Sequence, residues 1–104
     1  MQDLNVLLVC GSGLSSGFMA ANIRKAAKKR GLKMKVKARS ESEIEGYLSE
    51  IDAILVGPHL AYLAEEIKGY ERTDNVKILL MSGDYYSSLN GEAALDHLLS
   101  ILEN

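Results

Sequence analysis

The stretch Leu4-Asn5-Val6-Leu7-Leu8-Val9-Cys10-Gly11-Ser12-Gly13 decides the fold, because a strand and the turn that ends it are both visible there. Its first six residues form a nearly continuous apolar run, which is typical of a strand buried on both faces of a parallel sheet. The run stops at Cys10, and a long helical pattern follows Gly13. A buried strand that leads through a glycine-rich turn into a helix predicts an α/β architecture.

Downstream of this unit, the alternation of strand and helix recurs three more times. Gly31 is well placed to end the first helix, and Ser40 with Glu43 forms a capping box. The expected elements after that helix are a strand over 32–38, a short helix over 41–48, a strand over 51–56, a helix over 59–68, a strand over 76–81 and a helix over 92–102. Together they predict one three-layer α/β/α domain over residues 1–104, with a four-stranded parallel sheet in the order 2-1-3-4.

The strand over 32–38 is expected at an edge of the sheet. It alternates apolar residues with Lys33, Lys35 and Lys37. Lysines along an edge strand discourage pairing with other chains.

Ligands of such sheets bind beyond the carboxyl ends of the strands, where the strand order reverses. With the first strand central, the relevant loops are 10–17, 57–62 and 82–86. The only cysteine of the chain lies in the first of these loops. The sequence therefore predicts a site at this edge, with Cys10 in it.

The composition bounds the class of protein. The chain has 104 residues, of which 47% are hydrophobic and 25% charged, with a single proline, as in a compact globular domain. One cysteine cannot form an internal disulfide, and an unpaired thiol fits a reducing compartment. The longest purely apolar runs are about five residues, far short of the roughly 20 that cross a bilayer. We expect a soluble cytoplasmic protein without a signal peptide or direct membrane insertion.

The charge is unevenly distributed along the chain, although the formal net charge is only −2. Nine basic residues lie between Arg24 and Arg39, whereas residues 41–104 contain three basic and thirteen acidic residues. The basic segment contains no aromatic residue and no known recognition motif, so nucleic acid is not an expected partner. The preferred interpretation is a solvated helix face with a charged sheet edge, and the alternative is a docking surface for an acidic protein.

The loop Cys10-Gly11-Ser12-Gly13-Leu14-Ser15-Ser16-Gly17 carries the chemistry that the sequence predicts. Its three glycines let the backbone wrap closely, with positive φ where required, so that successive N–H groups point at one centre. Its three serines offer hydroxyl donors, and the helix N-terminus behind the loop adds partial positive charge. Such a cradle favours a dianion such as phosphate.

Cys10 is the candidate catalytic residue of this loop. Donors that favour an anion also favour the thiolate, which lowers the pKa of the thiol from its usual value of about 8.5. A thiolate inside a phosphate cradle is a nucleophile toward phosphorus, and its expected product is a phosphocysteine. The alternative is an inert, buried cysteine whose neighbouring glycines only make a turn.

Other ligand motifs do not fit this loop. No Gly-Lys-Ser/Thr follows it, and Gly11-x-Gly13-x-x-x-Gly17 is one residue too long for a dinucleotide fingerprint. The cysteine and the two histidines, His59 and His97, do not have the spacing of zinc ligands. We therefore expect no nucleotide, no metal and no cofactor.

A cysteine-dependent phosphatase or arsenate reductase-like enzyme is the nearest chemical alternative. The loop of low-molecular-weight tyrosine phosphatases is Cys-x5-Arg, and the arginine position falls on Ser16 here. Without that arginine, transition-state stabilisation for hydrolysis is weakened. Asp84-Tyr85-Tyr86 nevertheless resembles the acid loop of these phosphatases, so the alternative stays open.

The chain resembles the IIB component of the lactose/cellobiose branch of the bacterial sugar phosphotransferase system. The resemblance rests on residues 6–17, on Ile54-Leu55-Val56-Gly57-Pro58-His59-Leu60-Ala61-Tyr62, and on residues 90–96. It implies a flavodoxin-like or Rossmann-like fold, related to that of the low-molecular-weight tyrosine phosphatases. It also implies a phosphoryl relay. Cys10 would accept phosphate from a phosphohistidine of the IIA component and pass it to a sugar, such as cellobiose or lactose, held by the membrane component IIC.

The resemblance also suggests contacts from the second and third loops, namely Pro58, His59, Tyr62 and Asp84. The family usually has Gln at the position of His59. We expect His59 to be a surface residue at a helix N-terminus, with a phosphate contact as the alternative. For Tyr62 we expect packing against the cysteine loop rather than a phosphate contact. A regulatory module that borrows the fold and docks through its basic segment is a third hypothesis.

Overall fold

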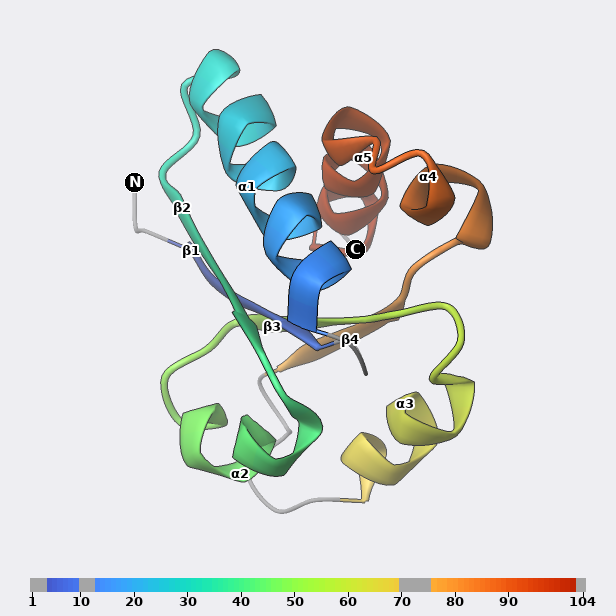
Figure 1. Ribbon diagram of the computed structural model, residues 1–104. Helices are drawn as coiled ribbons and strands as arrows, with labels where there is room; N and C mark the ends of the chain where they lie inside the picture. Colours follow the sequence, from blue (N-terminus) through green and yellow to red (C-terminus); the bar gives the residue numbers. More distant parts are fainter. Residues whose placement is uncertain (1–3, 10–12, 70–75, 103–104) are drawn as a thin grey trace.

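The fold is built on a four-stranded parallel sheet. The computed structural model describes residues 4–9, 13–69 and 76–102. For residues 13–16 it describes the backbone but not the side chains. The strands are β1 (Leu4–Val9), β2 (Met34–Arg39), β3 (Ala53–Val56) and β4 (Lys77–Leu80), in the order β2-β1-β3-β4 (Figure 1). The strand order and the parallel pairing predicted from the sequence are therefore confirmed.

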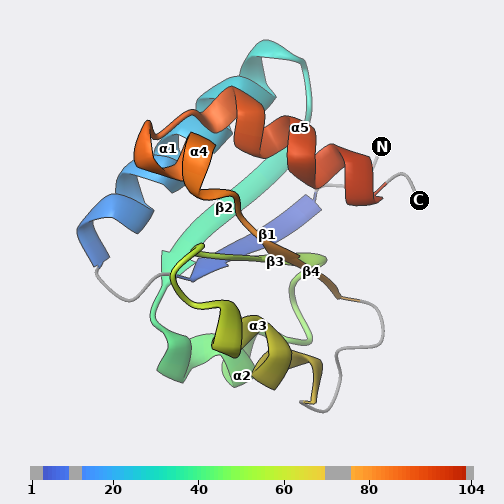
Figure 2. The same ribbon diagram turned by 90° about the vertical axis from the view of Figure 1, so that its right-hand side faces the viewer.

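Helices cover both faces of this sheet (Figures 1 and 2). The helices α1 (Gly13–Lys29), α4 (Gly83–Ser87) and α5 (Gly91–Leu102) cover one face. The 3₁₀ turn η1 (Glu41–Glu43), α2 (Ile44–Tyr47) and α3 (Ala61–Lys68) cover the other. Within the described ranges, no helix combines the length and the apolar character that a membrane span requires.

Strand β1 contributes to two separate hydrophobic cores. Val6 and Leu8 belong to the core under α1 and α5, whereas Leu7 and Val9 belong to the core over α2 and α3. All four side chains are buried. Successive side chains of a strand point to opposite faces, so an uninterrupted apolar run is required where both faces are covered.

In contrast to the continuous apolar run of β1, buried and exposed residues alternate along β2, which lies at an edge of the sheet. Val36 is buried, while Lys35 and Lys37 are exposed on the other face of the strand. A guanidinium nitrogen of Arg24 also donates a hydrogen bond of 2.6 Å to the Val36 carbonyl oxygen. The lysines and this contact both oppose the addition of a further strand.

The expected helix boundaries are present. Gly31 has φ +72°, and the N–H of Leu32 donates to the carbonyl oxygen of Ala27 at 2.9 Å, which closes the C-terminal end of α1. At the start of η1, the Glu43 carboxylate accepts hydrogen bonds from the Ser40 N–H at 3.1 Å and from its hydroxyl at 3.0 Å. The Ser40 backbone donor lowers the pKa of Glu43.

Two elements differ from expectation. The short helix expected over 41–48 is divided into η1 and α2. Helix α4 was not predicted, because five residues are too few to show a helical period. Its signal is local instead: Ser82 is the N-cap, and its hydroxyl accepts a hydrogen bond from the Asp84 N–H at 3.3 Å.

Helices α1 and α5 pack closely, with Gly91 at the point of contact. The Asn22 amide donates to the Leu89 carbonyl oxygen at 2.8 Å, and Arg30 forms ion pairs with Glu92 at 2.8 Å and Asp96 at 2.7 Å. A Cβ built on Gly91 would lie 2.4 Å from the Asn22 carbonyl carbon and oxygen. Only glycine permits this approach of the two backbones.

We expect Gly91→Ala to lower the free energy of unfolding by about 1–3 kcal/mol, because α1 and α5 must move apart. Urea denaturation followed by circular dichroism measures this change. The matched control is Gly46→Ala in α2, where no heavy atom lies within 4 Å of the added Cβ. The control is expected to be neutral or to stabilise by up to ~1 kcal/mol. Equal stability of the two variants would contradict the packing described.

Candidate functional site

The candidate site lies at the carboxyl edge of the sheet, where β1, β3 and β4 end. The backbone links these ends: the Gly57 N–H donates to the Val9 carbonyl oxygen at 3.0 Å, and the Met81 N–H donates to that of Val56 at 2.9 Å. The parallel arrangement brings the turns after the three strands to one side of the molecule, as expected.

Helix α1 begins at this edge with Gly13. The first four N–H groups of an α-helix have no partner within the helix, and the helix dipole makes this end positive. Neither acidic nor basic side chains occur in the first turn, Gly13-Leu14-Ser15-Ser16. The N-terminus of α1 is therefore an environment that favours an anion.

The structure corrects one part of the predicted phosphate loop. Residues 13–17 were expected to belong to the loop, but they are helical. Gly17 has no positive φ: among the described residues, the only glycine with one is Gly31. Cys10, Gly11 and Ser12 lie outside the described residues, as do the side chains of 14–16.

His59 lies in the turn between β3 and α3, at the same edge. Its side chain is exposed, as expected, and Pro58 beside it is half-buried. A Cβ built on Gly57 would be 3.0 Å from His59 Cε1 and 3.6 Å from the Val9 carbonyl oxygen. The imidazole therefore lies against the backbone that pairs with Val9, the residue before Cys10.

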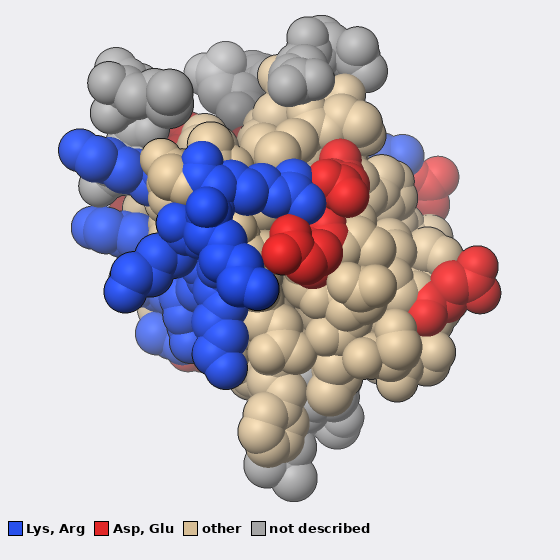
Figure 3. Space-filling view, turned by 90° about the horizontal axis from the view of Figure 1, so that it is seen from above, with Lys and Arg blue, Asp and Glu red and all other residues tan. Residues whose placement is uncertain are grey.

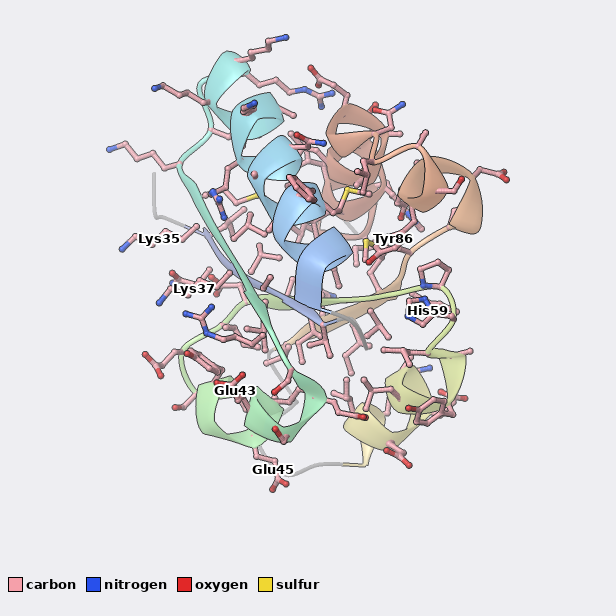
Figure 4. All side chains as sticks on the ribbon, in the orientation of Figure 1. Lys35, Lys37, Glu43, Glu45, His59 and Tyr86 are labelled. Carbon is pink, nitrogen blue, oxygen red and sulfur yellow. The ribbon has the colours of Figure 1, made fainter. Side chains whose placement is uncertain are left out.

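Tyr86 completes this side of the edge. Its ring is buried, and it contacts the His59 ring edge to face, with 6.2 Å between centroids and 61° between planes (Figure 4). The contact joins the β3–α3 turn to α4, two segments that are far apart in the sequence. Sequence reasoning did not assign Tyr86 a role. The local sequence feature that marks this segment as helical is Ser82, the N-cap of α4.

Two further residues that were expected to contribute to the site, Tyr62 and Asp84, are exposed on helices. Tyr62 is on α3 and is 54% exposed; the cysteine loop against which it is expected to pack lies largely outside the described residues, so this expectation stays a prediction. Asp84 is exposed in the first turn of α4 rather than in a loop. Among the described residues, no three His, Asp or Glu side chains form a group that could hold a metal ion.

Tyr85 and His97 form a second polar pair between α4 and α5. The Tyr85 hydroxyl and His97 Nδ1 are 2.6 Å apart, and the rings contact each other edge to face. His97 is therefore a half-buried histidine with a hydrogen-bond partner. Burial raises the pKa of Tyr85.

We expect Tyr85→Phe to destabilise the protein by about 1 kcal/mol at pH 8, because His97 loses its partner. A raised pKa means that the folded state disfavours the phenolate, so this contribution falls as the pH rises above about 10. Urea unfolding at pH 8 and at pH 10.5 measures both effects. Tyr62→Phe is the control at an exposed tyrosine. A difference that grows with pH would contradict the assignment.

Comparison with family models identifies a match over residues 5–97 to "PTS system, Lactose/Cellobiose specific IIB subunit". The lactose-specific EIICB component of Lacticaseibacillus casei is 28% identical over 102 residues, which are 96% of this chain and 18% of that protein. The oligo-beta-mannoside-specific EIIB component of Bacillus subtilis is 23% identical over 99 residues, which are 95% of this chain and 96% of that protein. The chain thus spans less than a fifth of the EIICB relative.

Solved structures show the same fold. The lactose-specific IIB domain from Streptococcus pneumoniae has a TM-score of 0.82 and 19% identity, covering 95% of this chain and 97% of that one. A low-molecular-weight phosphotyrosine phosphatase from Vibrio cholerae has a TM-score of 0.62 and 13% identity, covering 97% of each chain. The relation in fold to these phosphatases, expected from the sequence, is confirmed.

Proposed function

The chain belongs to the lactose/cellobiose-specific IIB family of the sugar phosphotransferase system, and we propose that Cys10 is its phosphoryl carrier. Membership of this family gives the chain a role in sugar phosphotransfer. The single observation that carries the finer proposal is the position of Cys10. It is the only cysteine of the chain, and it comes directly after Val9, the last residue of β1 at the carboxyl edge.

The proposed relay has two in-line displacements at phosphorus. In the first, the Cys10 thiolate attacks a phosphohistidine of the IIA component, so that an S–P bond forms and the N–P bond breaks. In the second, a sugar hydroxyl attacks, an O–P bond forms, the S–P bond breaks, and the hydroxyl proton leaves. Positioning and charge stabilisation dominate the catalysis of such transfers.

The N-terminus of α1 supplies partial positive charge and unpaired N–H groups for this chemistry. Gly13 starts the helix only three residues after Cys10, so the positive end of the helix and its unpaired N–H groups belong to the same short segment. We propose that residues 11–17 hold the phosphoryl oxygens through backbone N–H groups and serine hydroxyls. The same field favours the thiolate of Cys10.

The proposed partners follow from the same relay. The IIA component donates the phosphoryl group, and the sugar acceptor, of the β-linked disaccharide class, is held by a IIC membrane component. The name of the Lacticaseibacillus casei relative combines C and B components in a single protein. In this proposal the chain acts in the cytoplasm, where its thiol stays reduced.

Incubation with IIA and the upstream phosphocarriers is expected to add one phosphate to Cys10, detected by mass spectrometry of the intact protein and its peptides. Cys10→Ser removes the thiolate and should abolish this modification. Phosphate found only on His59 or His97 would refute the assignment.

The phosphatase alternative is tested on the same samples. Ser16 occupies the position at which the phosphatase loop requires arginine, so hydrolysis of p-nitrophenyl phosphate is expected to be close to background. Turnover that depends on Cys10, without a stable phosphocysteine, would favour a hydrolase over a carrier.

A contact between His59 and the transferred phosphoryl group, made from the second loop, is the alternative to the expected surface role of His59. The position of the imidazole against Gly57, whose N–H donates to Val9, favours this alternative. A hydrogen bond to a charged group contributes about 1.5–3 kcal/mol, so a contact predicts that His59→Ala slows the phosphorylation of Cys10 roughly tenfold or more, whereas a surface role predicts an unchanged rate.

Rapid-quench measurement of phosphocysteine formation tests this role. His97→Gln is the matched control, because His97 pairs with Tyr85. His59→Gln should retain much of the rate, since the amide N–H can also donate. Equal rates for His59→Ala and the unmodified protein across pH 6–8 would show that His59 is only a surface residue.

A further inference from the structure

A basic face covers the C-terminal half of α1 and the start of β2. We define it by six exposed side chains: Arg24, Lys25, Lys28, Lys29, Lys33 and Lys35. Figure 3 shows most of the visible basic side chains gathered on one side of the molecule, with acidic side chains along the border of this group and on the opposite side. All six residues of this face belong to the basic segment between Arg24 and Arg39 that the sequence shows.

The demands of the fold explain only part of this face. Lys33 and Lys35 protect the β2 edge, and Lys28 and Lys29 suit the negative C-terminal end of α1. Arg24 occupies a carbonyl oxygen of the β2 edge through its hydrogen bond to Val36, whereas Lys25 has no role either at the strand edge or in the last turn of α1. They also stand four residues before Lys28 and Lys29, and like charges at this spacing destabilise a helix.

The neighbouring Arg30 differs from the residues of the basic face, because carboxylates of α5 neutralise its charge. Arg30 pairs with Glu92 and Asp96 on α5 at 2.8 and 2.7 Å, and these carboxylates raise its pKa. Within residues 4–9, 13–69 and 76–102, no ion pair involves the six residues of the basic face. Within the described part of the chain, no ion pair therefore offsets their mutual repulsion; Glu92, which lines a depression together with Lys25 and Lys29, is paired with Arg30.

Part of the basic face surrounds a shallow depression. This open depression of about 620 Å³ is lined by Arg24, Lys28, Gly31, Leu32, Lys33, Met34 and Lys35. Leu32 and Met34 are half-buried where they pack against the core, and they supply an apolar patch between the cations. The hydrogen bond from Arg24 to the Val36 carbonyl oxygen holds one side of the rim in place.

We propose that the basic face binds an acidic segment of a partner protein, with an apolar side chain of that segment over Leu32 and Met34. Charge complementarity selects acidic residues, and the apolar patch selects a protein over other polyanions. Nucleic-acid surfaces of proteins commonly add aromatic side chains for stacking, and none lines this depression.

The position of the face separates it from the phosphoryl site. Arg24 to Lys29 lie 11–16 residues beyond Gly13 in α1, about 16 to 24 Å along the helix axis. An acidic partner can therefore bind while the carboxyl edge is engaged elsewhere. This inference does not rest on the proposed relay.

Fluorescence anisotropy with two labelled peptides of equal length tests the proposal at about 0.15 M salt. One peptide repeats Glu-Glu-Leu-Glu, and the other contains glutamate only. We expect the leucine-containing peptide to bind at least fivefold more tightly. The double variant Lys28→Glu/Lys33→Glu should weaken its binding at least tenfold, and Leu32→Ser should remove the preference for leucine.

The matched control is Lys68→Glu/Lys77→Glu, which makes the same charge change on α3 and β4. It should alter the peptide affinity by less than twofold, and circular dichroism should show that both double variants are folded. Equal weakening by both double variants, or equal binding of the two peptides, would overturn the proposal. Tighter binding of a DNA duplex or of phosphatidylglycerol vesicles than of the leucine peptide would also overturn it.

The experiment is independent of the relay, because anisotropy requires no phosphoryl transfer. If Cys10 proves not to be phosphorylated, binding at the basic face is still measured. Conversely, Lys28→Glu/Lys33→Glu is expected to leave the rate of Cys10 phosphorylation within twofold of the unmodified protein. A larger loss would place the basic face in the relay and contradict its separation from the carboxyl edge.

Discussion

The burial of β1 on both faces is the constraint on which the rest of the structure depends. β1 pairs with β2 on one side and β3 on the other, so its backbone groups are satisfied within the sheet. Its side chains alternate between two cores, and a shift by one residue would exchange every one of them. The register of β1 is therefore strongly determined, and with it the position of Val9 at the carboxyl edge.

Helix α1 carries two separate surfaces that both favour negative charge. Its N-terminal end, at the carboxyl edge of the sheet, favours an anion, while its C-terminal half presents cations to solvent. Both ends agree with the helix dipole, so one element supports an anion site and a basic face without conflict. Packing against α5, through Gly91 and the ion pairs of Arg30, holds the helix in the orientation that both surfaces require.

The segments at the carboxyl edge are linked to one another and to the helices behind them by specific contacts. The Gly57 turn is tied to Val9 by a backbone hydrogen bond, and the contact between His59 and Tyr86 ties the same turn to α4. Tyr85 and His97 in turn attach α4 to α5. A short helix that periodicity does not reveal thus becomes part of the rigid frame of the edge, because its two tyrosines contact different neighbours.

The sequence by itself determined the strand order, the two-sided burial of β1, the edge position of β2 and the helix ends at Gly31 and Ser40. The burial pattern of each strand and the helix ends follow from local periodicity or from a capping residue, and the strand order follows from these patterns together with the connection rules of α/β sheets. Only the tertiary structure decided that residues 13–17 are helical, that α4 exists, and that Tyr86 lies against His59. The two helical segments are too short, or too close to a turn, to show a helical period. The contact between Tyr86 and His59 joins segments that are distant in sequence, so its energy cannot be read from the sequence before the sheet brings the segments together.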